Sequence, residues 1–360
     1  MDGSPPQQDE LAAWLERKLP MLWRSAAPVS VKVLTPDASG RFFYRVELAG
    51  GRRSTPHSAV VVELGDHDLP PYVRVLKLLP DPPPEPPYLN VQRFLRSIGA
   101  PVPELYHADL AARRLLVEDV GATSVFVAAR TQAEHVADLY RSAIKELLWL
   151  HVEGTRALDS RCVAAQISYD ARLFRWEMNE FLEVGLPCHF PDAAVNAHVP
   201  ELDELAGRLG TFARVFSHRD YHGANLFVQD GSSIRILDFQ DALLAPHAQD
   251  LAVLLTTRDT TDLIDPALER RLLLFYLGGL HRRGAASMNE AAFFESYWLC
   301  VLQHALKVVG RFTSLERQGK GGYLRYVPYA VANARRALRE LGDFPILSRT
   351  LATFGAGVPR

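Results

Sequence analysis

Residues 214–242, RVFSHRDYHGANLFVQDGSSIRILDFQDA, form a β-rich island in a half of the chain that is otherwise helical in its periodicity. Inside this island, two short apolar runs flank the dipeptide Gly231-Ser232, which is typical of a hairpin turn. A two-residue turn would pair Asn225 with Asp238, and a longer loop would change the register but keep these two residues close. The stretch therefore predicts a hairpin with two polar side chains at its open end.

Three residues of this stretch also stand at an informative spacing. Four residues separate Asp220, in His218-Arg219-Asp220, from Asn225, and Asp238 follows thirteen residues after Asn225. This order is similar to the kinase catalytic loop H-R-D-x-x-x-x-N and the metal-binding Asp that follows it. In that loop, the first Asp accepts the proton of the attacking hydroxyl, while the Asn and the second Asp bind magnesium.

Each of the three residues has a simpler interpretation when it is taken alone. Asp220 could be a turn residue, Asn225 a cap and Asp238 the solvated end of a strand. Their order, their spacing and the predicted hairpin together favour a phosphoryl-transfer centre. We therefore expect Asp220 to be the catalytic residue and Asn225 and Asp238 to be metal ligands.

The composition is that of an ordinary globular protein and argues against several partners. Lys and Arg total 40 against 42 Asp and Glu, so the net charge of −2 gives no attraction to nucleic acid or to an anionic membrane. The three cysteines are scattered without a C-x-x-C pair, which argues against a disulfide framework or a zinc site. A polar N-terminal segment, and no apolar run of about 18 residues, predict a cytoplasmic protein without a membrane partner.

The first part of the chain predicts a helix followed by a sheet. Apolar residues at helical spacing indicate a helix over residues 11–23. Six prolines in residues 80–87 exclude a helix there, so the next helix, over residues 91–98, is expected to begin beyond them. Between the two helices, Gly, Pro and Asp separate β-rich runs that favour an antiparallel sheet, namely residues 29–34, 42–48, 58–64 and 72–79.

The boundary between the sheet and the helical half is expected near residue 120. A strand in RRLLVEDVG ends at Gly121, and helical periodicity dominates the rest of the chain. We therefore expect an α+β protein with two lobes. The N-terminal lobe, residues 1–120, would contain the antiparallel sheet, and the C-terminal lobe, residues 121–360, would be mainly helical.

Beyond the short spacing, HRDYHGAN and LDFQDALLAP resemble the aminoglycoside phosphotransferase and choline kinase group. Protein kinases are less similar, because only eleven residues separate Asp238 from Asp250 and Gln240 replaces the Gly of D-F-G. The late segments LQHALKVVGRF and QGKGGYLRYVP are similar to the bacterial cell-wall sugar anomeric kinases, which phosphorylate N-acetylmuramate and N-acetylglucosamine at O1. The resemblance implies a protein-kinase-like two-lobed fold that binds ATP and Mg²⁺ between its lobes.

The same resemblance implies the residues that contact the nucleotide. Ser39, Gly40 and Arg41 lie between two predicted strands and would belong to the loop that covers the phosphates. Glu118 and Val120 would offer backbone groups to the adenine. These roles are implied by the family and do not depend on a motif in the segments themselves.

Lys77 stands at the end of the predicted strand 72–79, where this group places the lysine that contacts the phosphates. Because its neighbours are apolar and one face of the strand must be buried, we favour that role over a solvated lysine. The Glu that normally pairs with this lysine is missing from the helix at 91–98, and Glu85 is the nearest carboxylate.

Residues beside the predicted centre are expected to contact the acceptor. His222 follows Asp220 by two residues in an exposed loop, and Gln240 and Asp241 come directly after the predicted hairpin. Arg311 on the late helix could line a pocket for an acidic substrate or face water.

Other polar residues have mainly structural interpretations. The family resemblance implies that Asp250 holds the catalytic loop in place. His151 at a helix end is expected to be a packed or capping histidine. Glu177 and Glu180 share a helix face, which is expected to face solvent.

The sequence thus predicts an ATP- and Mg²⁺-dependent kinase for a small-molecule sugar, with the anomeric hydroxyl of an N-acetylhexosamine as acceptor. One alternative is a kinase for another hydroxyl, on an aminoglycoside or a choline-like amine. Acidic pockets favour such cationic acceptors, whereas the late helix carries Lys307 and Arg311. A catalytically silent nucleotide-binding relative is a further alternative, against which the intact Asp220, Asn225 and Asp238 argue.

Overall fold

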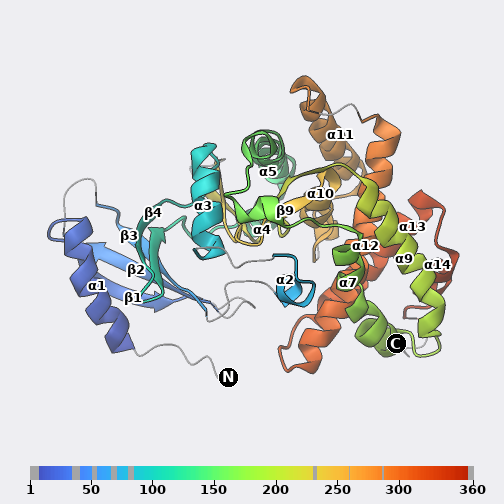
Figure 1. Ribbon diagram of the computed structural model, residues 1–360, viewed down its shortest axis with the longest axis horizontal. Coiled ribbons are helices and arrows are strands. Elements are labelled where there is room, and N and C mark those ends of the chain that lie inside the picture. The colour runs from blue at the N-terminus through green and yellow to red at the C-terminus, as the bar shows by residue number, and fades with distance from the viewer. Residues whose placement is uncertain are drawn as a thin grey trace. The chain divides into compact units, whose positions relative to one another are not determined.

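The computed structural model describes residues 8–34, 41–50, 55–65, 71–79, 85–229, 233–258, 260–285 and 288–355, and Figure 1 shows the course of the chain. The chain divides into two compact units, one made of residues 1–70 and 102–122 and the other of residues 71–101 and 123–360. An antiparallel sheet in the first unit and helices in the second confirm the predicted α+β class. The functional division at residue 120 stays a prediction.

The first unit is a five-stranded antiparallel sheet with one helix on it. The strand order is β1-β2-β3-β5-β4, so β5 lies between β3 and β4. Helix α1 (Gln8–Leu22) buries its apolar stripe, which includes Trp14 and Leu15, against sheet residues such as Tyr44 and Val61. The strands are β1 (Ala27–Val33), β2 (Phe42–Ala49), β3 (Ser58–Glu63), β4 (Leu105–Asp109) and β5 (Arg114–Glu118). Three of the four predicted β-rich runs are thereby confirmed.

The fourth predicted strand, residues 72–79, is wrong. Helix α2 (Pro71–Val75) begins there, and the backbone nitrogen of Leu76 donates to the carbonyl oxygen of Tyr72 at 2.9 Å, a helical bond. Tyr72 and Val73 are buried in succession, whereas a half-buried strand alternates. Lys77 is exposed in the turn that follows, with a φ angle of 50°. This segment belongs to the second unit and not to the sheet.

The second unit consists mainly of helices, together with two short antiparallel strand pairs. The longest helix, α12 (Glu290–Arg317), packs against α13 (Val327–Leu341), as Figure 1 shows. Helix α3 starts at Pro87, the last proline of the predicted run, because a first-turn proline needs no helical N–H partner. The remaining helices are α4 (Val125–Thr131), α5 (Val136–Trp149), α6 (Thr155–Ala157), α7 (Ala171–Glu177), α8 (Leu186–His189), α9 (Val195–Thr211), α10 (His247–Thr256), α11 (Pro266–Arg282) and α14 (Pro345–Ala352), with α3 ending at Ser97.

The strands of the second unit position the predicted centre. Strand β6 (Arg214–Ser217) pairs with β9 (Leu243–Pro246), and β7 (Leu226–Gln229) pairs with β8 (Ser233–Ile236). Gln229 stands opposite Ser233, so the register differs by one residue from the prediction, which paired Asp230 with Ser233. The backbone nitrogen of Leu237 consequently donates to the carbonyl oxygen of Asn225 at 2.9 Å. The turn itself lies outside the described residues.

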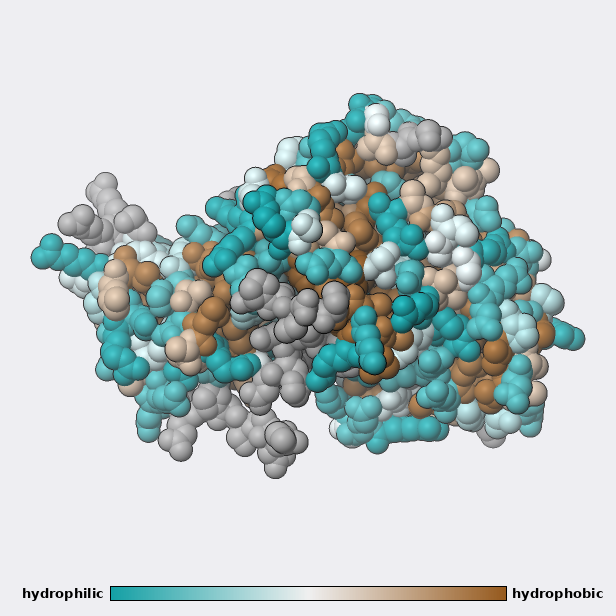
Figure 2. Space-filling view, in the orientation of Figure 1, coloured by the Kyte–Doolittle hydropathy of each residue, from teal (hydrophilic) through white to brown (hydrophobic). Residues whose placement is uncertain are grey.

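The surface of the second unit is mixed in character. Hydrophilic and hydrophobic residues are interspersed over the face visible in Figure 2. Within the described ranges, no helix is both long enough and apolar enough to cross a membrane.

Candidate active site

The loop between β6 and β7 is held by a buried carboxylate on α10. Asp250 is fully buried and accepts hydrogen bonds from the backbone nitrogens of His218 and Arg219, each at 2.8 Å. Arg219 has a φ angle of 75°, which is uncommon for a residue other than glycine. The two bonds to one carboxylate fix this strained turn directly before Asp220. The role that the family resemblance implied for Asp250 is thereby confirmed.

A buried chain of hydrogen bonds orients the Asp250 carboxylate. His151 Nε2 lies 3.1 Å from Asp250 Oδ2, so the imidazole donates there and accepts at Nδ1 from the hydroxyl of Tyr276 at 2.5 Å. His247 Nδ1 lies 3.0 Å from the Tyr276 oxygen and donates to it. Burial lowers the pKa of His247 to about 3, which keeps its ring neutral in this role. His151 is thus structural, as expected.

Asp220 is half-buried at the centre of the loop. Burial alone would raise its pKa, but the positive charges of Arg219 and Lys307 outweigh this effect and lower the pKa below its usual value. In the part of the chain that the structure describes, no group donates a hydrogen bond to the carboxylate of Asp220. An ionised carboxylate with open acceptor positions can take a proton from a hydroxyl group placed against it.

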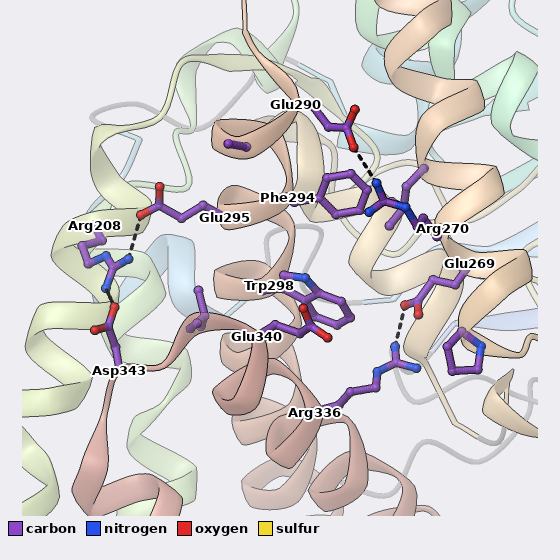
Figure 3. Close-up of a pocket in the computed structure, with 14 residues that line it drawn as sticks. Arg208, Glu269, Arg270, Glu290, Phe294, Glu295, Trp298, Arg336, Glu340 and Asp343 are labelled. Carbon is purple, nitrogen blue, oxygen red and sulfur yellow. Dashed lines mark hydrogen bonds and ion pairs between the residues drawn. The ribbon is translucent and has the colours of Figure 1, made fainter.

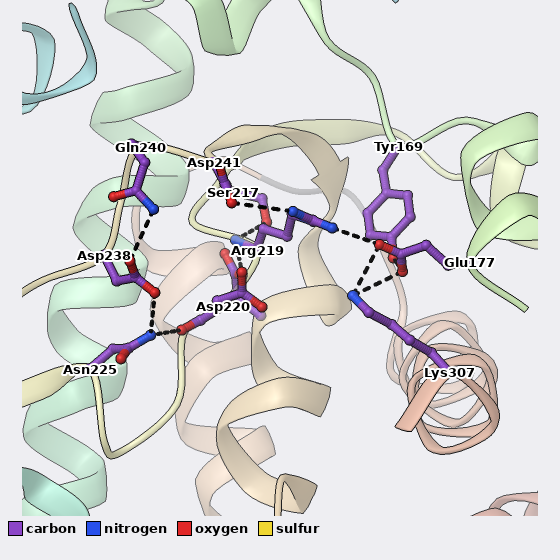
Figure 4. Close-up of polar contacts among 11 residues, drawn as sticks. Tyr169, Glu177, Ser217, Arg219, Asp220, Asn225, Asp238, Gln240, Asp241 and Lys307 are labelled. Carbon is purple, nitrogen blue, oxygen red and sulfur yellow. Dashed lines mark hydrogen bonds and ion pairs between the residues drawn. The ribbon is translucent and has the colours of Figure 1, made fainter. Parts of the chain in front are cut away.

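Asn225 and Asp238 meet beside Asp220, as the hairpin predicted (Figure 4). The side-chain nitrogen of Asn225 lies 3.0 Å from the backbone carbonyl oxygen of Asp220 and 3.4 Å from Asp238 Oδ2. Gln240 Nε2 donates to Asp238 Oδ1 at 2.9 Å, which leaves Oδ2 directed toward Asn225. Three residues predicted at separate positions of the sequence are therefore neighbours.

The donor set fits a magnesium ion. Asn225 contributes an amide oxygen and Asp238 a carboxylate, which are the hard oxygen ligands that Mg²⁺ prefers. Among the described residues, no group of three or more His, Cys, Asp or Glu residues forms a metal site by itself.

His222 lies against the same pair. Its Nε2 is 3.5 Å from the side-chain nitrogen of Asn225, and its Nδ1 is buried without a hydrogen-bond partner among the described residues. Burial and the charge of Arg258 lower the pKa of His222 to about 4, so the ring is neutral near pH 7. A neutral imidazole here can donate a hydrogen bond to a ligand or accept one from it, but it adds no positive charge.

A buried ion cluster lies on the other side of Asp220. Glu177 Oε1 accepts from Arg219 at 2.8 Å and from Lys307 at 3.0 Å, and Tyr169 also donates to this carboxylate (Figure 4). Glu177 is only 5% exposed, so the expectation of a solvated face is wrong for this residue. Burial raises its pKa, but Lys307 and Arg219 together hold the value at about 2. The carboxylate therefore stays charged between the two cations.

The predicted acceptor residues divide into two groups. Gln240 contacts Asp238, and Asp241 lies 3.6 Å from Arg219, so both stand beside the centre. Arg311 is 47% exposed and forms an ion pair with Glu180 at 3.2 Å. Lys307, four residues earlier on α12, is the cation of this helix that reaches the cluster.

The predicted nucleotide residues of the first unit lie on or near its sheet. Glu118 ends β5, and the buried Val120 follows it. Arg41 precedes β2 with its guanidinium 5.9 Å from the ring of Phe43. Ser39 and Gly40 lie outside the described residues. Each role stays a prediction.

Comparison with known proteins agrees with this geometry. A model of the phosphotransferase enzyme family matches residues 33–286, which is more than half of the chain. The chain belongs to the phosphotransferase enzyme family. It is therefore a small-molecule kinase that transfers phosphate to a hydroxyl group.

Three curated relatives of this phosphotransferase are named N-acetylmuramate/N-acetylglucosamine kinase. The protein of Pseudomonas aeruginosa is 27% identical over 93% of this chain and 94% of its own length. That of Neisseria meningitidis serogroup B is 29% identical over 71% of this chain and 76% of its own. That of Caulobacter vibrioides is 28% identical, and the match spans only 65% of each chain.

Solved structures show that the phosphotransferase has the predicted protein-kinase-like fold. Choline kinase LicA from Streptococcus pneumoniae is similar with a TM-score of 0.58 at 13% identity, over 93% of this chain and 100% of that chain. The ADP-bound aminoglycoside phosphotransferase APH(2'')-Ib is similar with a TM-score of 0.53 at 10% identity, over 91% and 99%. At such low identity, the likeness concerns the fold.

The structure adds a clamp in the phosphotransferase that sequence reasoning missed. Arg45 on β2 donates to both carboxylate oxygens of Asp119, at 2.7 and 2.8 Å, and to the carbonyl oxygen of Gly121 at 2.7 Å. Gly121 has a φ angle of 87°, a conformation that glycine adopts readily. The clamp fixes the backbone around Val120, the segment predicted to face adenine. The only sequence signal was an Asp-Val-Gly turn after a strand.

A cavity of about 850 Å³ lies elsewhere in the second unit, between α9, α11, α12 and α13 (Figure 3). Its arginines are already paired, Arg208 with Asp343 at 2.7 Å and Arg336 with Glu269 at 2.6 Å. On α12, the cavity residue Trp298 is about 13 Å along the axis from Lys307. The cavity is therefore separate from the residues predicted to be catalytic.

Proposed function

We propose that this phosphotransferase uses ATP and Mg²⁺ to phosphorylate the anomeric hydroxyl of an N-acetylhexosamine, of the N-acetylmuramate or N-acetylglucosamine kind. The observation that carries the proposal is the convergence of Asp220, Asn225 and Asp238 in a chain whose curated relatives are named for these two sugars. The AMP complex of choline kinase LicA, which has a TM-score of 0.55 with this chain, supports the choice of an adenine nucleotide.

The transfer step makes one bond and breaks one. The acceptor oxygen bonds to the γ-phosphorus of ATP, the bond from that phosphorus to the β–γ bridging oxygen breaks, and ADP leaves. The proton of the acceptor hydroxyl passes to the carboxylate of Asp220. Asn225 and Asp238 would hold Mg²⁺, which neutralises phosphate charge when it is bound.

The charge around Asp220 favours an acidic hydroxyl. Arg219 and Lys307 lower the pKa of Asp220, so the carboxylate is ionised near pH 7 but is a weak base. An anomeric hydroxyl is more acidic than an ordinary sugar alcohol, which narrows the mismatch between proton donor and acceptor.

The test is a comparison of free sugars with sugars blocked at O1. We expect N-acetylglucosamine or N-acetylmuramate to yield a 1-phosphate with release of ADP, whereas the methyl glycoside of the same sugar should not react. Phosphorus NMR of the product identifies the phosphorylated oxygen. Phosphate on O6 or O3, or equal rates with the methyl glycoside, would contradict the anomeric proposal. Turnover of choline or an aminoglycoside alone would favour the alternative kinases.

A further inference from the structure

Tyr72 on α2 lies against the catalytic loop of the second unit. The Tyr72 side chain is only 2% exposed, and its ring centroid is 4.2 Å from the guanidinium carbon of Arg219. Arg219 directly precedes Asp220 in the chain. A segment far from the loop in the sequence thus supplies an aromatic face to the residue beside the catalytic carboxylate.

Helix α2 is attached to the same region by two further contacts. Arg172 on α7 donates to the carbonyl oxygen of Leu76 at 3.0 Å. The ring of Tyr72 lies 6.3 Å from that of Trp176, also on α7 and next to Glu177. Helix α2, α7 and the catalytic loop therefore form one contact region around the ion cluster.

Arg219 needs this aromatic face because it is a buried charge. Its side chain is 11% exposed and pairs with Glu177 at 2.8 Å and with Asp241 at 3.6 Å. Its Nε is buried without a hydrogen-bond partner in the described part of the chain. Burying a guanidinium removes its hydration, and the negative face of an aromatic ring offsets part of that loss.

The hydroxyl of Tyr72, unlike its ring, does not stabilise Arg219. It is buried and has no hydrogen-bond partner among the residues that the structure describes. An unpaired buried hydroxyl destabilises a fold. The contact that stabilises Arg219 therefore comes from the ring of Tyr72 and not from its hydroxyl.

We propose that Tyr72 is a positioning residue, whose ring holds the guanidinium of Arg219 and thereby maintains the charge environment and loop geometry of Asp220. Through Tyr72, helix α2 then helps to hold the catalytic loop in place. The proposal rests on the proposed role of Asp220 as proton acceptor.

Two substitutions separate the ring from the hydroxyl. Tyr72→Phe keeps the ring, so kcat should stay within twofold of wild type, and Tm should be equal or higher because the unpaired hydroxyl is gone. Tyr72→Leu removes the ring, and kcat should fall at least tenfold while KM for ATP changes less than twofold. Tyr329→Phe on α13 removes a hydroxyl that donates to Asp262, and it should leave kcat and KM for ATP unchanged.

An NMR measurement that needs no acceptor substrate tests this proposal separately from the proposed function. In nitrogen-15 NMR of arginine Nε–H groups, the Arg219 signal, identified by its loss in Arg219→Lys, should carry a ring-current shift. The shift should persist in Tyr72→Phe and vanish in Tyr72→Leu. If wild type phosphorylates no sugar, the sugar-kinase proposal falls while the NMR result still decides the position of Arg219.

Three outcomes would overturn the role of Tyr72. The first is a Tyr72→Leu variant that melts at a lower temperature but retains kcat when folded, which would make Tyr72 purely structural. The second is a Tyr72→Phe variant as impaired as Tyr72→Leu, which would assign the effect to the hydroxyl. The third is an unchanged Arg219 signal in Tyr72→Leu.

Discussion

The carboxylate oxygen Oδ2 of Asp238 lies 3.4 Å from the side-chain nitrogen of Asn225, although thirteen positions separate the two residues in the chain. This proximity puts an amide and a carboxylate at one point beside the backbone of Asp220. The predicted magnesium role needs only that these two residues lie side by side, because their amide and carboxylate oxygens are the ligand types that Mg²⁺ prefers.

We therefore expect Asp238→Ala to weaken nucleotide binding in the presence of magnesium by at least tenfold, because a metal ligand is lost. Calorimetry of ATP binding with Mg²⁺ and with a chelator measures the effect. Asp159→Ala, which removes an exposed carboxylate paired with Arg161, should bind like wild type. Equal affinities of wild type and Asp238→Ala with Mg²⁺ would remove the metal role.

The proximity of Asn225 and Asp238 was predictable because it depends on local sequence. Two apolar runs with a Gly-Ser dipeptide between them define a hairpin, and its ends meet whatever the loop length. The register was wrong by one residue, since a dipeptide alone does not fix whether a turn has two or three residues.

Asp220→Asn should retain the fold and nucleotide affinity while kcat falls by about 10²- to 10⁴-fold. The change removes the proton acceptor and preserves side-chain volume. Steady-state kinetics with the preferred sugar measures kcat, and circular dichroism checks the fold. Turnover within tenfold of wild type would show that another group accepts the proton.

The burial of Glu177 could not be predicted from the sequence. Its helix carries other charged residues, and a charged helical face normally points to solvent. Its partners Arg219 and Lys307 come from positions 42 and 130 residues away, and no local pattern reports such contacts. The same limit affected residues 72–79, where β-branched residues suggested a strand but the chain forms a short helix with Tyr72 buried.

Glu177→Gln should lower the free energy of unfolding by about 3 to 5 kcal/mol, because it leaves two buried cations with less compensation. Urea denaturation near pH 7 measures the loss. Glu180→Gln removes the exposed partner of Arg311 and should cost less than about 1 kcal/mol. Equal losses in the two variants would mean that the cluster does not stabilise the fold.

The Glu177 contribution should also depend on pH in a defined direction. Its folded-state pKa of about 2 lies below the ordinary value of a carboxyl group. The contribution is therefore complete above about pH 5 and is lost as the pH falls toward 2.

Lys77 keeps a predicted role although its strand does not exist. If Lys77 contacts the phosphates, Lys77→Ala should raise KM for ATP at least fivefold, because a positive charge is lost. Arg74→Ala removes another exposed cation of the same segment and should leave KM for ATP unchanged. Glu85 pairs with Arg93, so Glu85→Ala should also have little effect. An unchanged KM in Lys77→Ala would end the role.

The final prediction concerns Lys307 and the pH dependence of catalysis. Lys307, after Arg219, lowers the pKa of Asp220, so Lys307→Gln should raise that pKa and move the acid limb of kcat/KM to higher pH. The sign follows because Asp220 must be ionised to accept a proton, and a higher pKa protonates it earlier as the pH falls. Arg311→Gln, one turn further along α12 and paired with Glu180, should leave the limb in place. High salt should shift the acid limb of the wild-type profile only slightly, because Lys307 is largely buried and its charge is weakly screened. A limb that moves to lower pH in Lys307→Gln, or moves equally in both variants, would show that Lys307 does not set the charge of Asp220.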